Sequence, residues 1–304
     1  MKQYKRNIKC EYFEVVCRNI LDNPNQSDRL FDLSLFIEKA DGLSFEDRKL
    51  SYYQEYARLD FIEYDRQNDL WFLSFVRLRE NNIPNIATET QVSKPIELAN
   101  DEYIGEDTYI LYDETLHIIM LQRNGHGLSP TGIEDYLNRV WKSNTEMIYL
   151  RAICPVELQS KLYASNQYRK INISLANMKE NSKMINLCNK TLGRLIDALS
   201  GFNGNRASFE VSIGMAKNDE LDKNEVREVI KDVYSNSSMI SGASITLRDT
   251  EGNVDIIDLF DKKLQDTLII YLDKKESVSS NEMMRVMIDQ YCKSKNKIKE
   301  SIDR

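Results

Sequence analysis

The hydrophobic and polar positions at the start of the chain predict a strand followed by a helix. Residues 7–18 are rich in β-branched and aromatic side chains, as is typical of a strand buried on both faces. From Leu30 to Ala40, apolar residues recur at helical spacing, and Gly42 stands where a C-terminal cap is expected. The pattern indicates that both element types occur from the start of the chain.

Two further strands are predicted by residues 59–65 and 70–80, which are joined by the polar turn 66–69. Side chains of a strand alternate between its two faces. One face of the second strand therefore carries Trp71, Leu73, Phe75, Arg77 and Arg79. The arginines either stack on these apolar residues at the rim of the sheet or offer paired donors to phosphate oxygens.

Residues 81–102 are polar, so we expect a long loop or cap. Residues 108–122 predict a hairpin that turns at 113–114. A helix follows, because Ser129 has the hydroxyl of an N-cap and Pro130 fits the first helical position.

The second half of the chain predicts a separate compact domain. Residues 169–177 alternate as a strand, and a helix, a strand at 208–216 and another helix follow. Residues 243–260 predict a hairpin that turns at Glu251–Gly252. This β-α-β-α-β order is typical of an α+β domain.

The chain ends in a predicted strand at 266–273 and a helix opened by the capping box Ser279-x-x-Glu282. We therefore predict an α+β protein of three parts. These are an N-terminal mixed α/β globular domain at 1–148, a second α+β domain at 149–260, and a C-terminal strand and helix at 261–304 that pack back on the globular domain.

Length and composition restrict the class of protein. With 304 residues, 41% of them apolar, the chain is long enough for a sizeable core and unlike a disordered protein. No apolar run approaches the roughly 20 residues of a membrane span. The N-terminus turns polar before a signal-peptide core could form. We expect a cytoplasmic protein without direct membrane insertion.

The cysteines and histidines argue against disulfide and metal frameworks. The five cysteines have no Cys-x-x-Cys spacing and are Cys10, Cys17, Cys154, Cys188 and Cys292. Only His117 and His126 could supply imidazole ligands, which excludes a histidine-rich site and leaves an all-oxygen Mg²⁺ site open. We expect no zinc site and no bound cofactor.

The net charge of −7 is concentrated in one segment. Between Lys94 and Arg123 there is no Lys or Arg, and the acidic residues are Glu97, Asp101, Glu102, Glu106, Asp107, Asp113 and Glu114. The rest of the chain is balanced, so a basic face can exist locally. The acidic segment is either a solvated loop and hairpin edge or a lid that competes with nucleic acid for that face.

The stretch 122–132, QRNGHGLSPTG, is the main candidate for chemistry. It lacks the third glycine of a dinucleotide-binding motif and the Lys-Ser/Thr of a P-loop. No nucleophile is identifiably paired with His126, which disfavours catalysis. A helix start offers backbone N–H groups to phosphate, and Arg123, Asn124 and His126 would add donors beside Ser129. The alternative is a capped turn without any ligand.

The segment Glu102–Asn138 resembles the central signature of a family of unknown function found in bacteria and prophages, above all at Gln122–Asn124 and His126–Pro130. That family resembles the RexA-like phage exclusion proteins in segment order from about Trp71 onward, and more distantly the KwaB component of Kiwa defence systems. The resemblance implies a homodimer that binds double-stranded DNA without sequence preference, with a second, swivel-like domain that gates the DNA cleft. It also implies a role in phage exclusion or defence beside a membrane partner encoded nearby. It provides no catalytic residues.

Our first hypothesis is therefore a non-enzymatic DNA-binding protein. Its phosphate contacts would be made by Arg77, Arg79, Arg123, Asn124, His126 and Ser129. Additional phosphate contacts would come from Arg169, Lys170, Lys293 and Lys295. The acidity of the chain departs from this expectation, and a dimer would have to concentrate the arginines along one groove.

Two other hypotheses remain open. A divalent-metal nuclease would use Glu106 and Asp107 near His126. A protein-interaction module would use the acidic hairpin to bind a phage or host protein.

Overall fold

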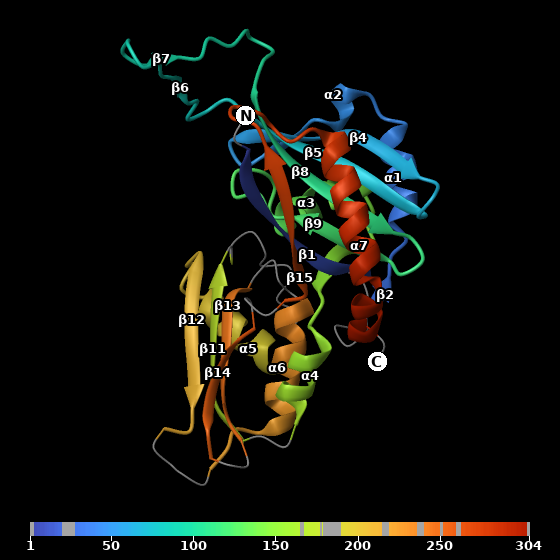
Figure 1. Cartoon of the computed structure of the whole chain (residues 1–304). Coiled ribbons are helices and arrows are strands. Elements are labelled where there is room, and N and C mark those ends of the chain that lie inside the picture. Colours follow the sequence, from blue (N-terminus) through green and yellow to red (C-terminus); the bar gives the residue numbers. More distant parts are fainter. Residues whose placement is uncertain are drawn as a thin grey trace. The chain divides into compact units, whose positions relative to one another are not determined.

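A computed structural model of the chain describes residues 3–19, 28–164, 167–176, 178, 190–214, 219–235, 240–249, 252–259 and 263–302. It shows an α+β fold of predominantly antiparallel strands, with a long C-terminal helix (Figure 1). The chain divides into two compact units, each assembled from three segments. Unit 1 comprises Met1–Glu11, Phe31–Ser143 and Asp266–Cys292, and unit 2 comprises Tyr12–Leu30, Asn144–Gln265 and Lys293–Arg304.

The sheet of unit 1 has the strand order β1-β9-β8-β5-β4-β3, and β15 also pairs with β1. Its strands are β1 (Tyr4–Asn19), β3 (Leu50–Tyr52), β4 (Glu55–Asp65), β5 (Leu70–Arg79), β8 (Ile104–Asp113), β9 (Ile118–Gln122) and β15 (Gln265–Leu272). The predicted strand pair 59–65 and 70–80 and the hairpin 108–122 are confirmed. Within 81–102, the loop includes only the short paired strands β6 (Asn85–Ile86) and β7 (Lys94–Pro95).

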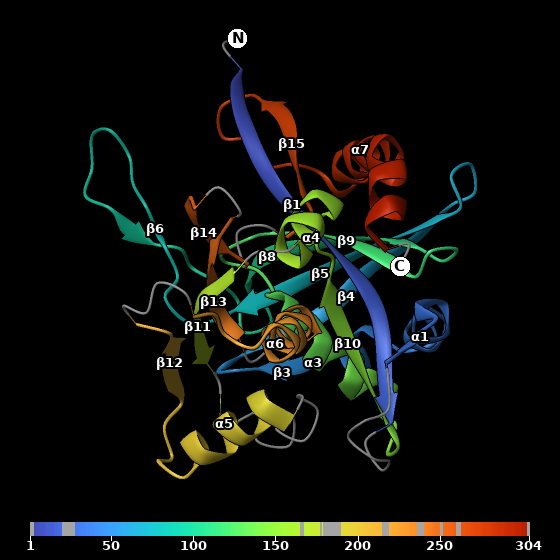
Figure 2. The ribbon, with the colours of Figure 1, turned by 90° about the horizontal axis from the view of Figure 1, so that it is seen from below.

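Helices cover both faces of this sheet, as Figure 2 shows from below. They are α1 (Leu33–Asp41), α2 (Phe45–Arg48), α3 (Pro130–Trp141) and α7 (Ser280–Ile302). Neighbouring residues of β8 identify the two faces, because side chains alternate. The Tyr112 hydroxyl donates to Asp32 beside α1 at 3.2 Å, whereas Asp113 accepts from Tyr291 of α7 at 2.9 Å. Thus α1 and α7 lie on opposite faces.

The first helix begins later than the sequence pattern predicts. Leu30 was expected to be its first apolar position, but it belongs to the short strand β2 (Arg29–Leu30) and is exposed. The helix starts at Leu33 because Asp32 is its N-cap and accepts from the Ser34 N–H at 3.0 Å. Gly42 occupies the predicted C-cap.

The C-terminal part of β1 belongs to unit 2 and pairs with β2 and with a strand that the sequence pattern did not predict, β10 (Glu146–Ala152). Phe13 and Val15 on one face of β1 and Tyr12 and Val16 on the other are buried, so burial on both faces is confirmed for residues 10–18, whereas Asn7 and Lys9 are exposed. Helix α4 (Val156–Tyr163) follows β10 and was also not predicted.

The rest of unit 2 confirms the predicted element order. It consists of β11 (Gln167–Ala176), α5 (Lys190–Ser200), β12 (Arg206–Ser212), α6 (Lys223–Ser235), β13 (Ile240–Arg248) and β14 (Val254–Asp258). The strands form an antiparallel sheet in the order β12-β11-β13-β14. Gly252 of the last hairpin has a φ of +89°, which favours glycine, while Glu251 lies outside the described residues.

Of the predicted capping box of the last helix, the bond to the Ser279 hydroxyl is confirmed. The Glu282 N–H donates to the Ser279 hydroxyl at 3.2 Å, and Met283, Met287 and Tyr291 of α7 are buried. Among the helices of the described ranges, none combines the length and the apolar character needed to cross a membrane.

Candidate functional site

The turn between β9 and α3 is fastened to strand β8 by its own polar groups. The Asn124 side chain donates to the Asp107 carbonyl oxygen at 2.9 Å and accepts from the His126 N–H at 3.1 Å. The Leu128 N–H donates to the Thr108 hydroxyl at 2.8 Å. Backbone groups that a phosphate could have used therefore have protein partners.

Two glycines of this stretch are required by packing. A Cβ on Gly127 would overlap the Thr108 hydroxyl, and a Cβ on Gly132 would come within 2.7 Å of the Tyr52 ring. A Cβ on Gly125 would meet nothing within 4 Å. The glycines at 127 and 132 thus allow close approach of protein atoms, and only Gly125 borders open space.

The start of α3 has the predicted cap. The Ser129 hydroxyl accepts from the Gly132 N–H at 3.1 Å, its carbonyl accepts from the Ile133 N–H at 2.9 Å, and Pro130 occupies the first helical position. Because the cap uses backbone donors of the first turn, binding of a phosphate here would depend mainly on side chains.

Arg77 connects strand β5 to this turn. Its Nε donates to Glu55 at 2.6 Å, and its Nη1 donates to the His126 carbonyl at 3.1 Å. The guanidinium also lies 5.7 Å from the centre of the Tyr52 ring. The ring beside Arg77 is thus that of Tyr52 on β3, whereas the sequence pattern suggested stacking on the apolar residues of its own strand, Trp71 and Phe75.

Arg79 and Arg123 also carry carboxylate partners. Arg79 donates to Glu106 at 2.8 Å, and Arg123 lies 3.4 Å from Glu11. The Arg123 N–H donates to the Lys9 carbonyl at 2.8 Å, and the Lys9 ammonium lies 3.6 Å from Glu11 as well. Lys9 and Glu11 are site residues that the sequence pattern did not identify, because they are distant in the chain from the turn.

The sheet thus gathers the predicted arginines at one end of unit 1. Arg77 and Glu106 are paired neighbours in β5 and β8, and Arg123 directly follows β9. Glu11 and Glu55 are only 6% and 7% exposed. The arrangement is an array of cations, each held by an acid, beside a capped helix start.

His126 and the carboxylates of the nuclease hypothesis do not come together. In the part of the chain that the structure describes, the hydrogen bonds of His126 are made by its backbone. Glu106 accepts from Arg79, whereas Asp107 accepts from the Tyr109 hydroxyl at 3.2 Å on the other face of β8. Within the described ranges, no three His, Cys, Asp or Glu side chains form a group that could hold a metal ion.

The additional basic candidates belong to unit 2. Lys170 binds Glu210 at 3.0 Å, and Arg169 donates to the Asp219 carbonyl at 3.3 Å. Lys293 and Lys295 lie on the last part of α7. These residues therefore belong to a different unit from the arginine array.

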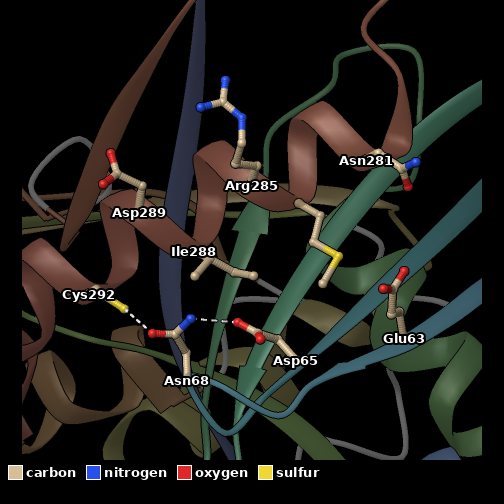
Figure 3. Close-up of a pocket in the computed structure, with 9 residues that line it drawn as sticks. Glu63, Asp65, Asn68, Asn281, Arg285, Ile288, Asp289 and Cys292 are labelled. Carbon is tan, nitrogen blue, oxygen red and sulfur yellow. Dashed lines mark hydrogen bonds between the residues drawn. The ribbon is translucent and has the colours of Figure 1, made fainter.

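A cavity that the sequence pattern did not predict lies between α7 and the β4–β5 turn in unit 1. It has a volume of about 590 Å³. Its lining includes the acidic residues Glu63, Asp65 and Asp289 and the cation Arg285. Figure 3 shows Asn68 between Asp65 and Cys292, with which it forms hydrogen bonds of 2.6 and 3.6 Å. Its lining residues come from α7 and from β4 and the turn after it, which are far apart in the chain, so no local pattern indicated this cavity.

The fold and this site define an α+β protein with an acid-paired arginine array beside a strand-to-helix turn. The chain belongs to the family of unknown function DUF6731, which it matches over residues 3–300. No curated protein matches the chain. The further resemblance to RexA-like and Kiwa proteins remains a prediction from the sequence.

Proposed function

We propose that this protein binds double-stranded DNA without sequence preference, through backbone phosphates. The observation that supports the proposal is the gathering of Arg77, Arg79 and Arg123 at one end of the unit 1 sheet. Arginine contacts phosphate oxygens through several donors at once, and phosphate contacts carry no base information. Asn124, His126 and Ser129 of the adjoining turn would border the same phosphates.

The acid partners set the expected strength of binding. A guanidinium that already holds a carboxylate gains less from a phosphate, because the phosphate has to compete with the acid. Glu11, Glu55 and Glu106 occupy this role for the three arginines. We therefore expect weak binding that is strongest at low salt.

The remaining parts of the proposal rest on the sequence resemblance. By that resemblance, the protein would form a homodimer in the cytoplasm and take part in phage exclusion or defence. It would act beside a membrane partner encoded nearby. The candidates Arg169, Lys170, Lys293 and Lys295 would contribute secondary phosphate contacts. The protein is proposed to act without catalysis.

The test is fluorescence anisotropy of labelled duplexes of two unrelated sequences, measured from about 50 to 200 mM salt. Arg123→Ala should weaken binding of both duplexes about equally and reduce the salt slope by about one. Arg66→Ala is the matched control, because Arg66 is exposed in the turn at the opposite end of β5. Absence of binding at low salt, or equal losses in the two variants, would contradict the proposal.

A further inference from the structure

A second cavity, of about 190 Å³, lies within unit 2 between α4, α6 and the end of β10. Its polar walls are formed by Arg151, Cys154, Gln159, Tyr163, Lys231 and Tyr234. None of these residues was a candidate on sequence grounds, and none belongs to the arginine array. The cavity therefore requires its own explanation.

Tyr234 brings a buried hydroxyl to this cavity. The residue is 7% exposed, and among the described residues its hydroxyl has no hydrogen-bond partner other than the weakly polar thiol of Cys154. Burial raises the pKa of Tyr234, so the phenol keeps its proton and acts as a donor. Buried donors normally have a partner, and an acceptor inside the cavity would provide it.

Helix α6 presents two cations on the side that carries Tyr234. Positions three, four and seven apart share one helical face, which places Arg227 and Lys231 in line with Tyr234. Arg227 donates to the Tyr163 carbonyl at 3.0 Å, and within the described residues its buried Nε has no partner. Lys231 binds Glu228 at 2.7 Å, with both side chains more than half exposed, at 58% and 51%. Such an exposed pair is weak, so Lys231 can turn to a ligand at little cost.

Arg151 of β10 forms another part of the cavity wall. Its Nε donates to Glu14 at 2.8 Å, and its Nη1 lies 3.7 Å from Asp28. Arg18 also binds Asp28, so the two carboxylates behind this wall are balanced by two guanidinium groups. Asp258 adds a negative charge that acts on Tyr234, and Arg227 adds a positive charge on the same face of α6 without lining the cavity. The donors of Lys231 and Tyr234, which do line it, favour an anion there.

We propose that this cavity binds the phosphate group of a small phosphorylated molecule. Arg151 of β10 and Lys231 and Tyr234 of α6 line the cavity, so donor groups of two elements border it and could share the several oxygens of a phosphate. The volume exceeds that of an inorganic phosphate ion, and Ala152 and Tyr163 offer a surface for a small organic group. The site lies in unit 2 and does not depend on DNA binding by unit 1.

The experiment is calorimetric titration of the full chain with inorganic phosphate and with glycerol 3-phosphate, at constant ionic strength. Both probes should bind at one site, and glycerol 3-phosphate should bind more tightly. Tyr234→Phe should weaken binding about tenfold or more, because a hydrogen bond to a charged group is lost. Lys231→Gln should weaken it less. Lys223→Gln is the matched control, because Lys223 lies on the same helix, pairs with Glu220 and does not line the cavity.

The folding of Tyr234→Phe is checked by thermal unfolding, and Lys231→Gln provides the test if the first variant does not fold. Arg123→Ala should leave phosphate binding unchanged, which separates this inference from the proposed DNA contact. Lack of binding of both probes, or equal affinity in Lys231→Gln, Tyr234→Phe and the native chain, would overturn the proposal.

Discussion

The Arg77 guanidinium donates to the His126 carbonyl oxygen at 3.1 Å, and this bond joins strand β5 to the turn that precedes α3. The same side chain holds Glu55, which is 7% exposed, at 2.6 Å. Arg77 therefore has a structural role in unit 1 besides the proposed contact with phosphate. The two roles can be separated by measuring stability and binding on the same variants.

Replacement of Arg77 by Met should destabilise the protein by about 2–4 kcal/mol, because the buried Glu55 carboxylate loses its partner. The free energy of unfolding in urea measures this. The double variant Glu55→Gln/Arg77→Met should recover much of the loss, since no unpaired charge is then buried. An equal loss in Arg66→Met, at the exposed turn, would show that the Arg77 contacts are not responsible.

Gly127→Ala should destabilise the protein by about 1–3 kcal/mol, because the added methyl group would overlap the Thr108 hydroxyl, which holds the Leu128 N–H. Gly125→Ala is the matched control and should change stability by no more than about 0.5 kcal/mol, since a Cβ there would meet nothing within 4 Å. Thermal unfolding of both variants checks the difference. Equal losses would mean that the Thr108 contact does not constrain the turn.

Glu11→Gln should strengthen DNA binding about three- to tenfold at low salt, because Arg123 and Lys9 lose a competing carboxylate. Glu63→Gln changes the net charge equally and is the matched control. Because Glu63 lies on β4 beside the α7 cavity, this change should have little effect on DNA binding. Anisotropy titrations of both variants separate local charge from net charge. Identical gains in the two variants would point to net charge alone.

Asp32→Ala should reduce stability by about 1 kcal/mol at neutral pH, through loss of the α1 N-cap. Burial raises the pKa of Asp32, but hydrogen bonds from Ser34 and Tyr112 outweigh it, so the net pKa is below the ordinary value. A lowered carboxyl pKa contributes stability that is fully present above the unfolded value of about 3.9 and is lost as the pH falls through the folded value.

The difference in the free energy of unfolding between the native protein and Asp32→Ala should therefore become smaller below about pH 4. Urea unfolding at several pH values measures it. Asp32→Asn keeps the capping oxygen and should retain most of the stability at neutral pH. A difference that stays constant down to about pH 2 would mean that the carboxylate charge of Asp32 is not involved.

Local sequence determined much of the secondary structure and part of the candidate site. The cap at Ser129 and Pro130, the alternation that puts Arg77 and Arg79 on one face of β5, and the element order of unit 2 were all predictable. These features depend on residues close together in the chain, whose relative positions are fixed by helix and strand geometry. The start of α1 was misplaced because Leu30 fits the helical spacing while Asp32 provides the cap.

Only the tertiary structure decided which groups meet. Nothing local links Arg123 to Glu11, Arg77 to the His126 carbonyl, or Tyr234 to the cavity beside β10. Such contacts join residues far apart in the chain, so they depend on which strands pair and how helices pack across the whole domain. The sequence alone thus determined the positions of the arginines and glycines along their strands, turns and helices. The tertiary structure determined their partners, because it brings carboxylates to the arginines and packed protein atoms to Gly127 and Gly132.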